Sequence, residues 1–168
     1  MRRKTCCFTG HRPHKLHYGF EEDHPDCIKL KIQIALEIQA LIGKGCDTFI
    51  TGMAMGTDIW WAELTLDLRR ANPEKCLKLI VAIPYEGQAD RWNRDYQERY
   101  YSILSKADDV VTLAAHYYEG CMQERNRYMV NHSAHMIAVF NGSGGGTKNA
   151  INYARRKGLD IVILNPSD

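Results

Sequence analysis

The sequence predicts an α/β protein, a single Rossmann-like domain over residues 1–168 in which helices cover both faces of a mainly parallel sheet. Two observations support this three-layer sandwich. Runs of strand-forming residues alternate with helical segments along the whole chain, as in proteins built from βαβ units. Several of these strands are apolar throughout, which is typical of strands buried on both faces. The chain has 168 residues, 45% of them hydrophobic, which is enough for one proper core.

The first half of the chain is expected to alternate strands and helices that end at glycine or proline. The opening strand, Thr5–Thr9, breaks at Gly10. A helix follows from an N-cap at Asp26 to about Ile42. Its apolar residues alternate with a period of two, but its length and its alanine and glutamate content favour a helix. The next elements are expected at residues 48–51 (strand), 58–71 (helix) and 77–83 (strand).

The second half continues the same alternation. A polar and aromatic helix is expected from Gln88 to Lys106, and the last helix is expected to end at the glycine C-cap Gly158. The remaining elements are expected at residues 109–113 (strand), 121–132 (helix), 136–140 (strand), 148–157 (helix) and 160–164 (strand).

The turns that follow the strands indicate where a ligand binds. In parallel sheets ligands bind outside the carboxyl ends of the strands, and each of these turns carries glycine or polar residues. Their convergence predicts one nucleotide-sized site at that edge. The turns are Gly10–Pro13, Gly52–Asp58, Pro84–Gln88 and Gly142–Thr147.

The glycine-rich turn Asn141–Thr147 is the strongest of these signals. It joins the apolar strand Met136–Phe140 to a helix, and a helix N-terminus attracts anions through its free N–H groups and its dipole. The spacing is not that of a P-loop and only weakly echoes G-x-G-x-x-G, and a plain surface loop is the alternative. We expect the N–H groups of Gly144, Gly145, Gly146 and Thr147 to face a phosphate.

Composition narrows the function further. The formal net charge is only +2, so nucleic acid is an unlikely partner. No apolar stretch approaches the roughly 20 residues of a membrane span, and six scattered cysteines without C-x-x-C spacing favour a cytoplasmic chain with reduced thiols. His11, His14 and His17 are spaced by three, but Pro13 disfavours a helix that would align them, so no metal site is expected.

Four ordered motifs resemble the YpsA-like branch of the SLOG superfamily. This Rossmann-like group includes DNA-processing protein A and the Lonely Guy hydrolases, which activate cytokinins. The resemblance covers nearly the whole chain and implies the fold and a ligand of the nucleotide class. The motifs are Phe8–Pro13, Ile50–Trp60, Ile83–Gln88 and Gly145–Thr147.

The resemblance also bears on catalysis. The segment Met122–Arg127 resembles that of the Lonely Guy hydrolases, whose arginine assists cleavage of an N-glycosidic bond, and equally the R-N-R segment of DNA-processing protein A. It implies that Arg125 contacts the ligand. The hydrolases carry a glutamate after the glycine turn, whereas here the first acid after Thr147 is Asp160. Glycosidic hydrolysis needs a carboxylate at the ribose, and the candidates to replace it are Asp58 and Glu86.

Two of the candidate residues also have simpler interpretations. Asp58 stands at the expected start of a helix, where it is either an N-cap or a carboxylate that contacts ribose or water. Arg12, between the first strand and Pro13, is either a surface charge or a phosphate clamp.

We therefore expect a protein that binds a nucleotide or a derivative such as ADP-ribose or NAD. It would serve as a ligand sensor or regulatory module, require no cofactor and assemble as a homo-oligomer such as a dimer. Two alternatives stay open, a nucleoside monophosphate phosphoribohydrolase and a single-stranded DNA-binding module. The expected ligand-binding residues are Gly10, Arg12, Gly52, Gly56, Asp58, Glu86, Arg125, Gly144, Gly145, Gly146 and Thr147.

Overall fold

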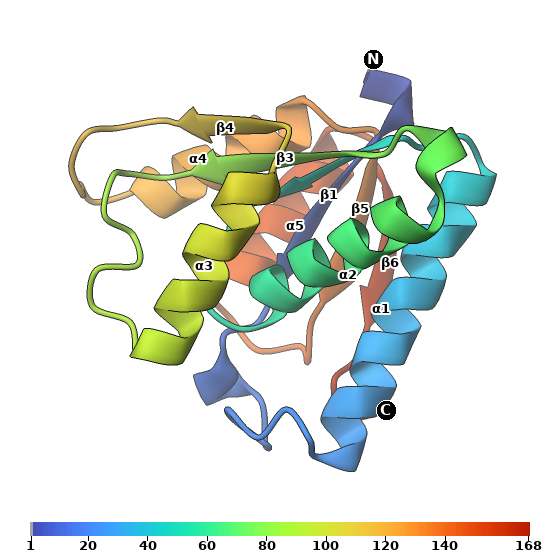
Figure 1. Ribbon diagram of the computed structural model, residues 1–168. Coiled ribbons are helices and arrows are strands. Elements are labelled where there is room, and N and C mark those ends of the chain that lie inside the picture. The colour runs from blue at the N-terminus through green and yellow to red at the C-terminus, as the bar shows by residue number, and fades with distance from the viewer. Residues whose placement is uncertain (1) are drawn as a thin grey trace.

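The computed structural model describes residues 2–168 and contains a six-stranded sheet between two layers of helices (Figure 1). Every pair of neighbouring strands is parallel, and the strand order is β4-β3-β2-β1-β5-β6. The predicted three-layer α/β fold is confirmed, with a sheet that is parallel throughout. The strands are β1 (Thr5–Gly10), β2 (Thr48–Thr51), β3 (Lys78–Ile83), β4 (Asp109–Thr112), β5 (His135–Val139) and β6 (Asp160–Leu164).

The helices form two layers of unequal size (Figure 1). Three helices cover one face of the sheet: α1 (Pro25–Gly43), α2 (Thr57–Ala71) and α3 (Arg94–Lys106). Two helices, α4 (Cys121–Asn131) and α5 (Gly146–Arg156), cover the other face. Cys6 and Cys7 of β1 belong to separate apolar clusters, one under each layer. Both faces of the central strands are therefore buried, as their continuous apolar runs predict.

Three short 3-10 helices complete the secondary structure, at Arg2–Lys4, Pro13–Lys15 and Pro73–Lys75. Within residues 2–168 no helix is both long and apolar enough to cross a bilayer.

Two helix starts differ from the sequence-based expectation. α1 begins at Pro25, and the side chain of His24 accepts the hydrogen bond from the Asp26 N–H, so the predicted N-cap at Asp26 is wrong. α3 begins at Arg94 because the side chain of Asn93 caps it. Gln88, predicted to start that helix, lies in an irregular turn and is buried.

The order of the strands reverses between β1 and β5, at the centre of the sheet. β1 leads to α1 on one face, while β5 leads to α5 on the other (Figure 1). The connections after these two strands diverge and leave a crevice at their carboxyl ends, which is the usual ligand site of such sheets. The fold therefore brings the turns after Gly10 and Val139 to one crevice.

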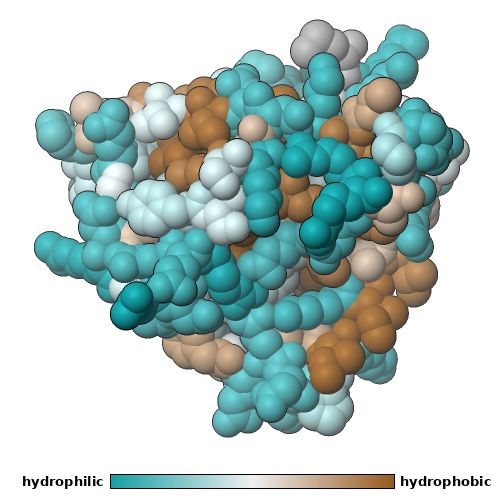
Figure 2. Space-filling model, in the orientation of Figure 1, coloured by the Kyte–Doolittle hydropathy of each residue, from teal (hydrophilic) through white to brown (hydrophobic). Residues whose placement is uncertain are grey.

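The outer face of α1 carries an apolar stripe. Ile28, Ile32 and Leu36 are exposed and lie one turn apart, and apolar atoms gather over α1 at the lower right of the surface in Figure 2. The homo-oligomer expected from the sequence stays a prediction.

Candidate functional site

Two adjoining pockets open at the carboxyl edge of the sheet. The inner pocket, about 270 Å³, lies between the end of β1 and the starts of α2, α4 and α5. The outer pocket, about 770 Å³, lies beside it over the turn that follows β3. Arg12, His14 and Met122 line both pockets, so one ligand could extend through the two.

The glycine turn meets the inner pocket at the start of α5. Gly145, Gly146 and Thr147 line this pocket, and no side chain caps the helix. Because the first N–H groups of a helix have no acceptor within it, they are free to bind an anion here. Gly144 is not among the residues that line this pocket, and its carbonyl accepts a hydrogen bond from Lys15 Nζ.

A buried histidine holds the glycine turn in place. His11 Nε2 lies 2.8 Å from Asn141 Oδ1, and the same oxygen accepts a hydrogen bond from the Ser143 N–H. Burial lowers the pKa of His11 below its ordinary value, although the contact with Asn141 acts in the opposite direction. Sequence reasoning considered His11 only as a metal ligand and missed this role, which joins residues 130 positions apart.

Arg125 forms the floor of the inner pocket. Its side chain comes from α4, is only 4% exposed, and donates hydrogen bonds to the Gly52 carbonyl and to Asn126 Oδ1. A Cβ at Gly52 would collide with the guanidinium, so a larger residue there would displace the Arg125 side chain from this position. Burial lowers the pKa of Arg125, whereas the charge of Asp58 raises it. Within residues 2–168 no carboxylate forms an ion pair with Arg125.

Asp58 is the one acidic residue among the described residues that line the inner pocket. It lies within the first turn of α2, whose N-cap is Gly56, so Asp58 is not the cap. Its Oδ2 instead accepts a hydrogen bond of 3.0 Å from the Ala54 N–H. Burial raises the pKa of Asp58 to about 6, although the charge of Arg125 and the Ala54 hydrogen bond lower it. Such a carboxyl changes its charge near neutral pH.

Two of the predicted glycines allow the crevice to close tightly. A Cβ on Gly10 would collide with Thr57 Oγ1, and a Cβ on Gly56 would come within 2.8 Å of Pro13 Cδ. Gly56 also has a φ of 96°, which disfavours other residues. Gly10 and Gly56 therefore bring the start of α2 against β1 and the segment that follows it.

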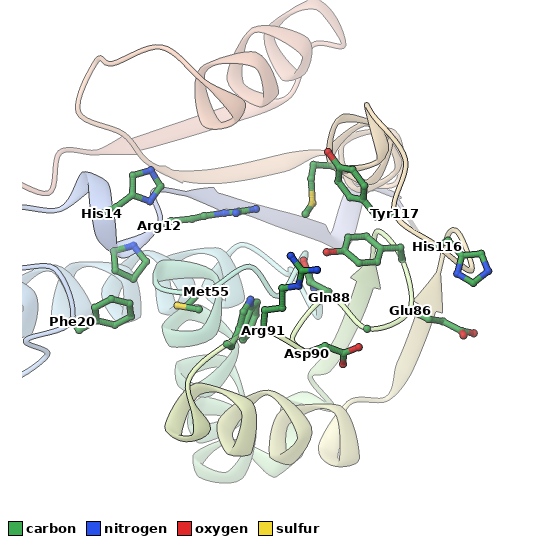
Figure 3. Close-up of a pocket in the computed structure, with 15 residues that line it drawn as sticks. Arg12, His14, Phe20, Met55, Glu86, Gln88, Asp90, Arg91, His116 and Tyr117 are labelled. Carbon is green, nitrogen blue, oxygen red and sulfur yellow. The ribbon is translucent and has the colours of Figure 1, made fainter.

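Charge in the inner pocket is predominantly positive. Arg12, Lys15 and Arg125 line it, against the single acid Asp58. Glu86 lies elsewhere, since it is exposed on the rim of the outer pocket and its carboxylate points away from Arg12 and Arg91 (Figure 3). The structure thus brings Arg12, Asp58 and Arg125 together at the inner pocket, whereas Glu86 shares only the outer pocket with Arg12.

One group in residues 2–168 has the spacing of metal ligands. His17, His24 and Asp26 bring their ligand atoms within 4.8 Å of one another, and His17 Nε2 lies 2.8 Å from Asp26 Oδ2. His11 and His14 line the inner pocket instead, so His11, His14 and His17, which are spaced by three in the sequence, do not form one cluster. His24 already caps α1, which gives this group a structural role.

Comparison with known proteins identifies the family. Residues 6–168 match the YspA SLOG family (YpsA). The chain belongs to this family. It is similar to the SPbeta prophage-derived protein YoqJ of Bacillus subtilis, with 32% identity over 85% of this chain and 91% of the other. It is also similar to a UPF0398 protein of Halalkalibacterium halodurans, with 27% identity over 98% of this chain and 89% of the other. The predicted YpsA-like membership is confirmed.

Two solved structures share the fold of this YspA SLOG protein. DNA processing protein A (DprA) of Streptococcus pneumoniae has a TM-score of 0.61 and 15% identity, and covers 96% of this chain. The match extends over half of the DprA chain. A structural-genomics target, TM1055, has a TM-score of 0.52 and 18% identity, with 94% of this chain and 72% of the other covered.

Proposed function

We propose that this SLOG protein binds a nucleotide or a derivative such as ADP-ribose, with a phosphate held between Arg125 and the N-terminus of α5. It would serve as a ligand sensor or regulatory module that needs no cofactor. The observation that carries the proposal is the buried guanidinium of Arg125, which has hydrogen-bond partners but no carboxylate in an ion pair.

A buried charge is costly unless an opposite charge compensates it. Among residues 2–168, the side chain of Arg125 has only a carbonyl, an amide oxygen and the Met122 sulfur within hydrogen-bonding distance. Asp58 lines the same pocket but forms no ion pair with Arg125. An anionic ligand would supply a negative charge in direct contact, since a guanidinium binds phosphate through paired charge-assisted hydrogen bonds.

The opposite wall of the inner pocket supports the same ligand. The uncapped start of α5 offers N–H groups and the positive end of the helix dipole. Thr147 adds a hydroxyl donor, while Arg12 and Lys15 add positive charge. A helix N-terminus that faces a buried arginine favours a phosphate over a neutral ligand.

Efficient hydrolysis is not expected from this site. No acid follows Thr147 before Asp160, and Asp160 lies at the start of β6, the end of the strand opposite the site. Without a carboxylate at the ribose, the site would bind the nucleotide and contribute little to cleavage of the glycosidic bond.

A phosphoribohydrolase is the second candidate, because Asp58 has the properties of an acid–base catalyst. It is buried beside the inner pocket, and its pKa of about 6 is close to the best value for proton transfer at neutral pH. The test is release of adenine from AMP by the wild-type protein. We expect no sustained turnover near 1 s⁻¹, which is typical of enzymes. Turnover at that rate that is lost in both Asp58→Asn and Arg125→Met would instead support the hydrolase.

Native mass spectrometry of the freshly purified protein tests the binding proposal. We expect a bound species with the mass of a nucleotide, or a new one after addition of ADP-ribose, and its loss in Arg125→Met. Arg99→Met is the control, since Arg99 lies outside both pockets and has carboxylate partners. A wild-type protein that retains neither a copurified nucleotide nor added ADP-ribose or AMP would contradict the proposal.

A further inference from the structure

The outer pocket has a lining unlike that of the inner pocket. Four aromatic side chains border it, Phe20, Tyr85, Trp92 and Tyr117, together with Met55 and Met122. Figure 3 shows Phe20 and Met55 on one side of it and Tyr117 on the other, with the guanidinium groups of Arg12 and Arg91 directed toward the middle. The same pocket is also lined by charged and polar residues, including Glu86, Asp90 and Arg91. Aromatic side chains at the wall of a pocket offer flat surfaces against which a ring can stack.

Two of these rings are unusually exposed for aromatic side chains. Tyr117 is 64% exposed and meets Tyr85 edge-to-face at 5.5 Å, and Phe20 is 57% exposed. Both contribute to the pocket without being buried in the core. Exposed rings around a cavity offer stacking surfaces, and stacking of a nucleic-acid base on such a ring is favourable.

One residue that lines this pocket has a buried polar atom without a hydrogen-bond partner among residues 2–168. Gln88 is 6% exposed, and its Nε2 donates a hydrogen bond of 3.3 Å to the Gly52 carbonyl. Its Oε1 is buried without a hydrogen bond, and Gln88 lines the outer pocket. The contact with Gly52 fixes the orientation of the amide, because a flipped amide would bring two oxygens together. Gln88 therefore offers a hydrogen-bond acceptor, and a buried unpaired acceptor is unfavourable until a donor reaches it.

We propose that the outer pocket binds the base of the ligand, and that Gln88 Oε1 accepts a hydrogen bond from the amino group of an aminopurine such as adenine. This inference rests on the proposed function, because it assigns the other end of the same ligand. Glutamine and asparagine amides are the side chains that pair with the adenine amino group in nucleic-acid recognition. Gln88 would thus determine which base is bound, while the inner pocket holds the phosphate.

The two pockets are joined at a single carbonyl group. The Gly52 oxygen accepts hydrogen bonds from both Gln88 Nε2 and Arg125 Nη1. The residue that would recognise the base and the residue that would bind the phosphate therefore have a fixed relation to each other. Arg12, which lines both pockets, lies where the middle of an extended ligand would pass.

Three probes separate base recognition from phosphate binding in calorimetric titrations: AMP, purine riboside 5′-monophosphate and ribose 5-phosphate. Purine riboside monophosphate keeps the ring and phosphate of AMP but lacks the amino group. A site that hydrogen-bonds a ligand group rejects the analogue that lacks it, so we expect the wild-type protein to bind AMP at least tenfold more tightly than this analogue. Ribose 5-phosphate should bind more weakly than either.

The variant Gln88→Met keeps the length of the side chain and removes its polar atoms. We expect it to abolish the discrimination between AMP and purine riboside monophosphate and to leave the affinity for ribose 5-phosphate unchanged. Gln39→Met, on the exposed face of α1, is the matched control and should change none of these affinities. Thermal unfolding of both variants checks that they are folded.

The outcomes distinguish this inference from the proposed function. Equal affinity of the wild-type protein for AMP and purine riboside monophosphate would overturn the role of Gln88, even if phosphate binding stands. Equal loss of affinity for all three probes in Gln88→Met would also overturn it. That result would indicate that Gln88 only holds the Gly52 carbonyl, and with it Arg125, in position. An absence of binding by all three probes to the wild-type protein would contradict the proposed function itself.

Discussion

Arg99 and Arg125 are two largely buried arginines with opposite surroundings. Arg99 of α3 forms ion pairs with Glu22 and Glu63, and its ring contact with Tyr96 is 4.8 Å. Burial lowers the pKa of Arg99, but the hydrogen bonds that its guanidinium donates to Glu22 and Glu63 outweigh burial and raise it. Arg125 of α4 is more buried, has no ion pair among residues 2–168, and its pKa is lowered.

The contrast separates a structural arginine from a candidate binding arginine. Arg99 links the segment before α1 to α2 and α3, and its charge is compensated within the protein. Arg125 lines a pocket and forms no ion pair among residues 2–168, and Asp58, the acid at that pocket, bonds to the Ala54 N–H. A buried charged group in a cleft with a perturbed pKa is a sign of function. Replacing each arginine in turn by methionine therefore tests whether the two have different roles.

The largest expected effect is the loss of ligand binding in Arg125→Met. Charge-assisted hydrogen bonds contribute about 1.5–3 kcal/mol each, and loss of two should weaken binding of AMP or ADP-ribose by roughly 100-fold or more. The free energy of unfolding should change by no more than about 1 kcal/mol, since an apolar side chain replaces an unpaired buried charge. Calorimetric titration and urea denaturation measure the two quantities. Unchanged affinity would show that Arg125 does not bind the ligand.

The reverse pattern is expected for Arg99→Met. Removal of this side chain leaves Glu22 and Glu63 without their main partner, and breaking such a partly buried network should cost about 2–3 kcal/mol of stability. Nucleotide affinity should stay within about twofold. Urea denaturation measures the loss of stability, and calorimetric titration measures the affinity. A loss of affinity as large as that of Arg125→Met would show that the two arginines do not have separate roles.

A third prediction concerns the pH dependence that Asp58 gives to stability. Its pKa rises from 3.8 in a free side chain to about 6 in the fold, so its stabilising contribution is complete below about pH 4 and is lost as the pH rises through 6. Relative to Asp58→Asn, which can still accept the Ala54 hydrogen bond, the wild-type protein should lose roughly 2 kcal/mol between pH 4 and 7. Denaturation curves across this range measure the difference. If the free energies of unfolding of the wild-type protein and Asp58→Asn change with pH in the same way, burial does not raise the pKa of Asp58.

A fourth prediction tests the α5 side of the site. Gly145 has a φ of 128° and a Cβ there would lie 2.9 Å from Lys15 Nζ, so Gly145→Val should distort the turn and weaken nucleotide binding by about tenfold or more. Gly158→Val is the control, since Gly158 also has a positive φ but lies at the far end of α5 with open space around it. Both variants should lose about 1–2 kcal/mol of stability. Equal nucleotide affinity of Gly145→Val and Gly158→Val would show that the glycine turn does not bind the ligand.

The smallest effect is expected for single-stranded DNA. The net charge of +2 and the small inner pocket favour mononucleotides, so binding of an oligonucleotide should be weak at physiological salt. Fluorescence anisotropy at several salt concentrations checks this, because a DNA-binding protein shows a steep fall of log K with log salt. Submicromolar binding with such a slope would favour the DNA-binding alternative.

Strand patterns were sufficient to predict the fold and the sheet edge at which the turns after the strands meet. Continuous apolar runs indicate a parallel sheet, and the turns after β1, β2 and β5 do meet at the inner pocket. Arg125 was selected only through the family resemblance, because an arginine on a helix has no local signal that distinguishes burial from exposure. Its contact with Gly52 joins residues 73 positions apart, which no local pattern reveals.

Gln88 was missed as an individual residue for a related reason. A glutamine after a Pro-Tyr-Glu-Gly turn resembles the polar start of a helix, and its burial depends on the approach of Gly52 from another strand. The available signal was its position after the clearest strand of the chain, since such turns contribute to ligand sites. Capping by Asn93, five residues later in the chain, explains why the helix starts beyond Gln88.

A crystal structure with AMP or ADP-ribose bound tests the central claim most directly. The account predicts a phosphate within hydrogen-bonding distance of both the Arg125 guanidinium and the first N–H groups of α5. A second cationic pocket lies between α4 and α5, where Arg127, Tyr153 and Arg156 are among the lining residues. A phosphate bound there, with the Arg125 side chain still bonded only to Gly52 and Asn126, would contradict the account.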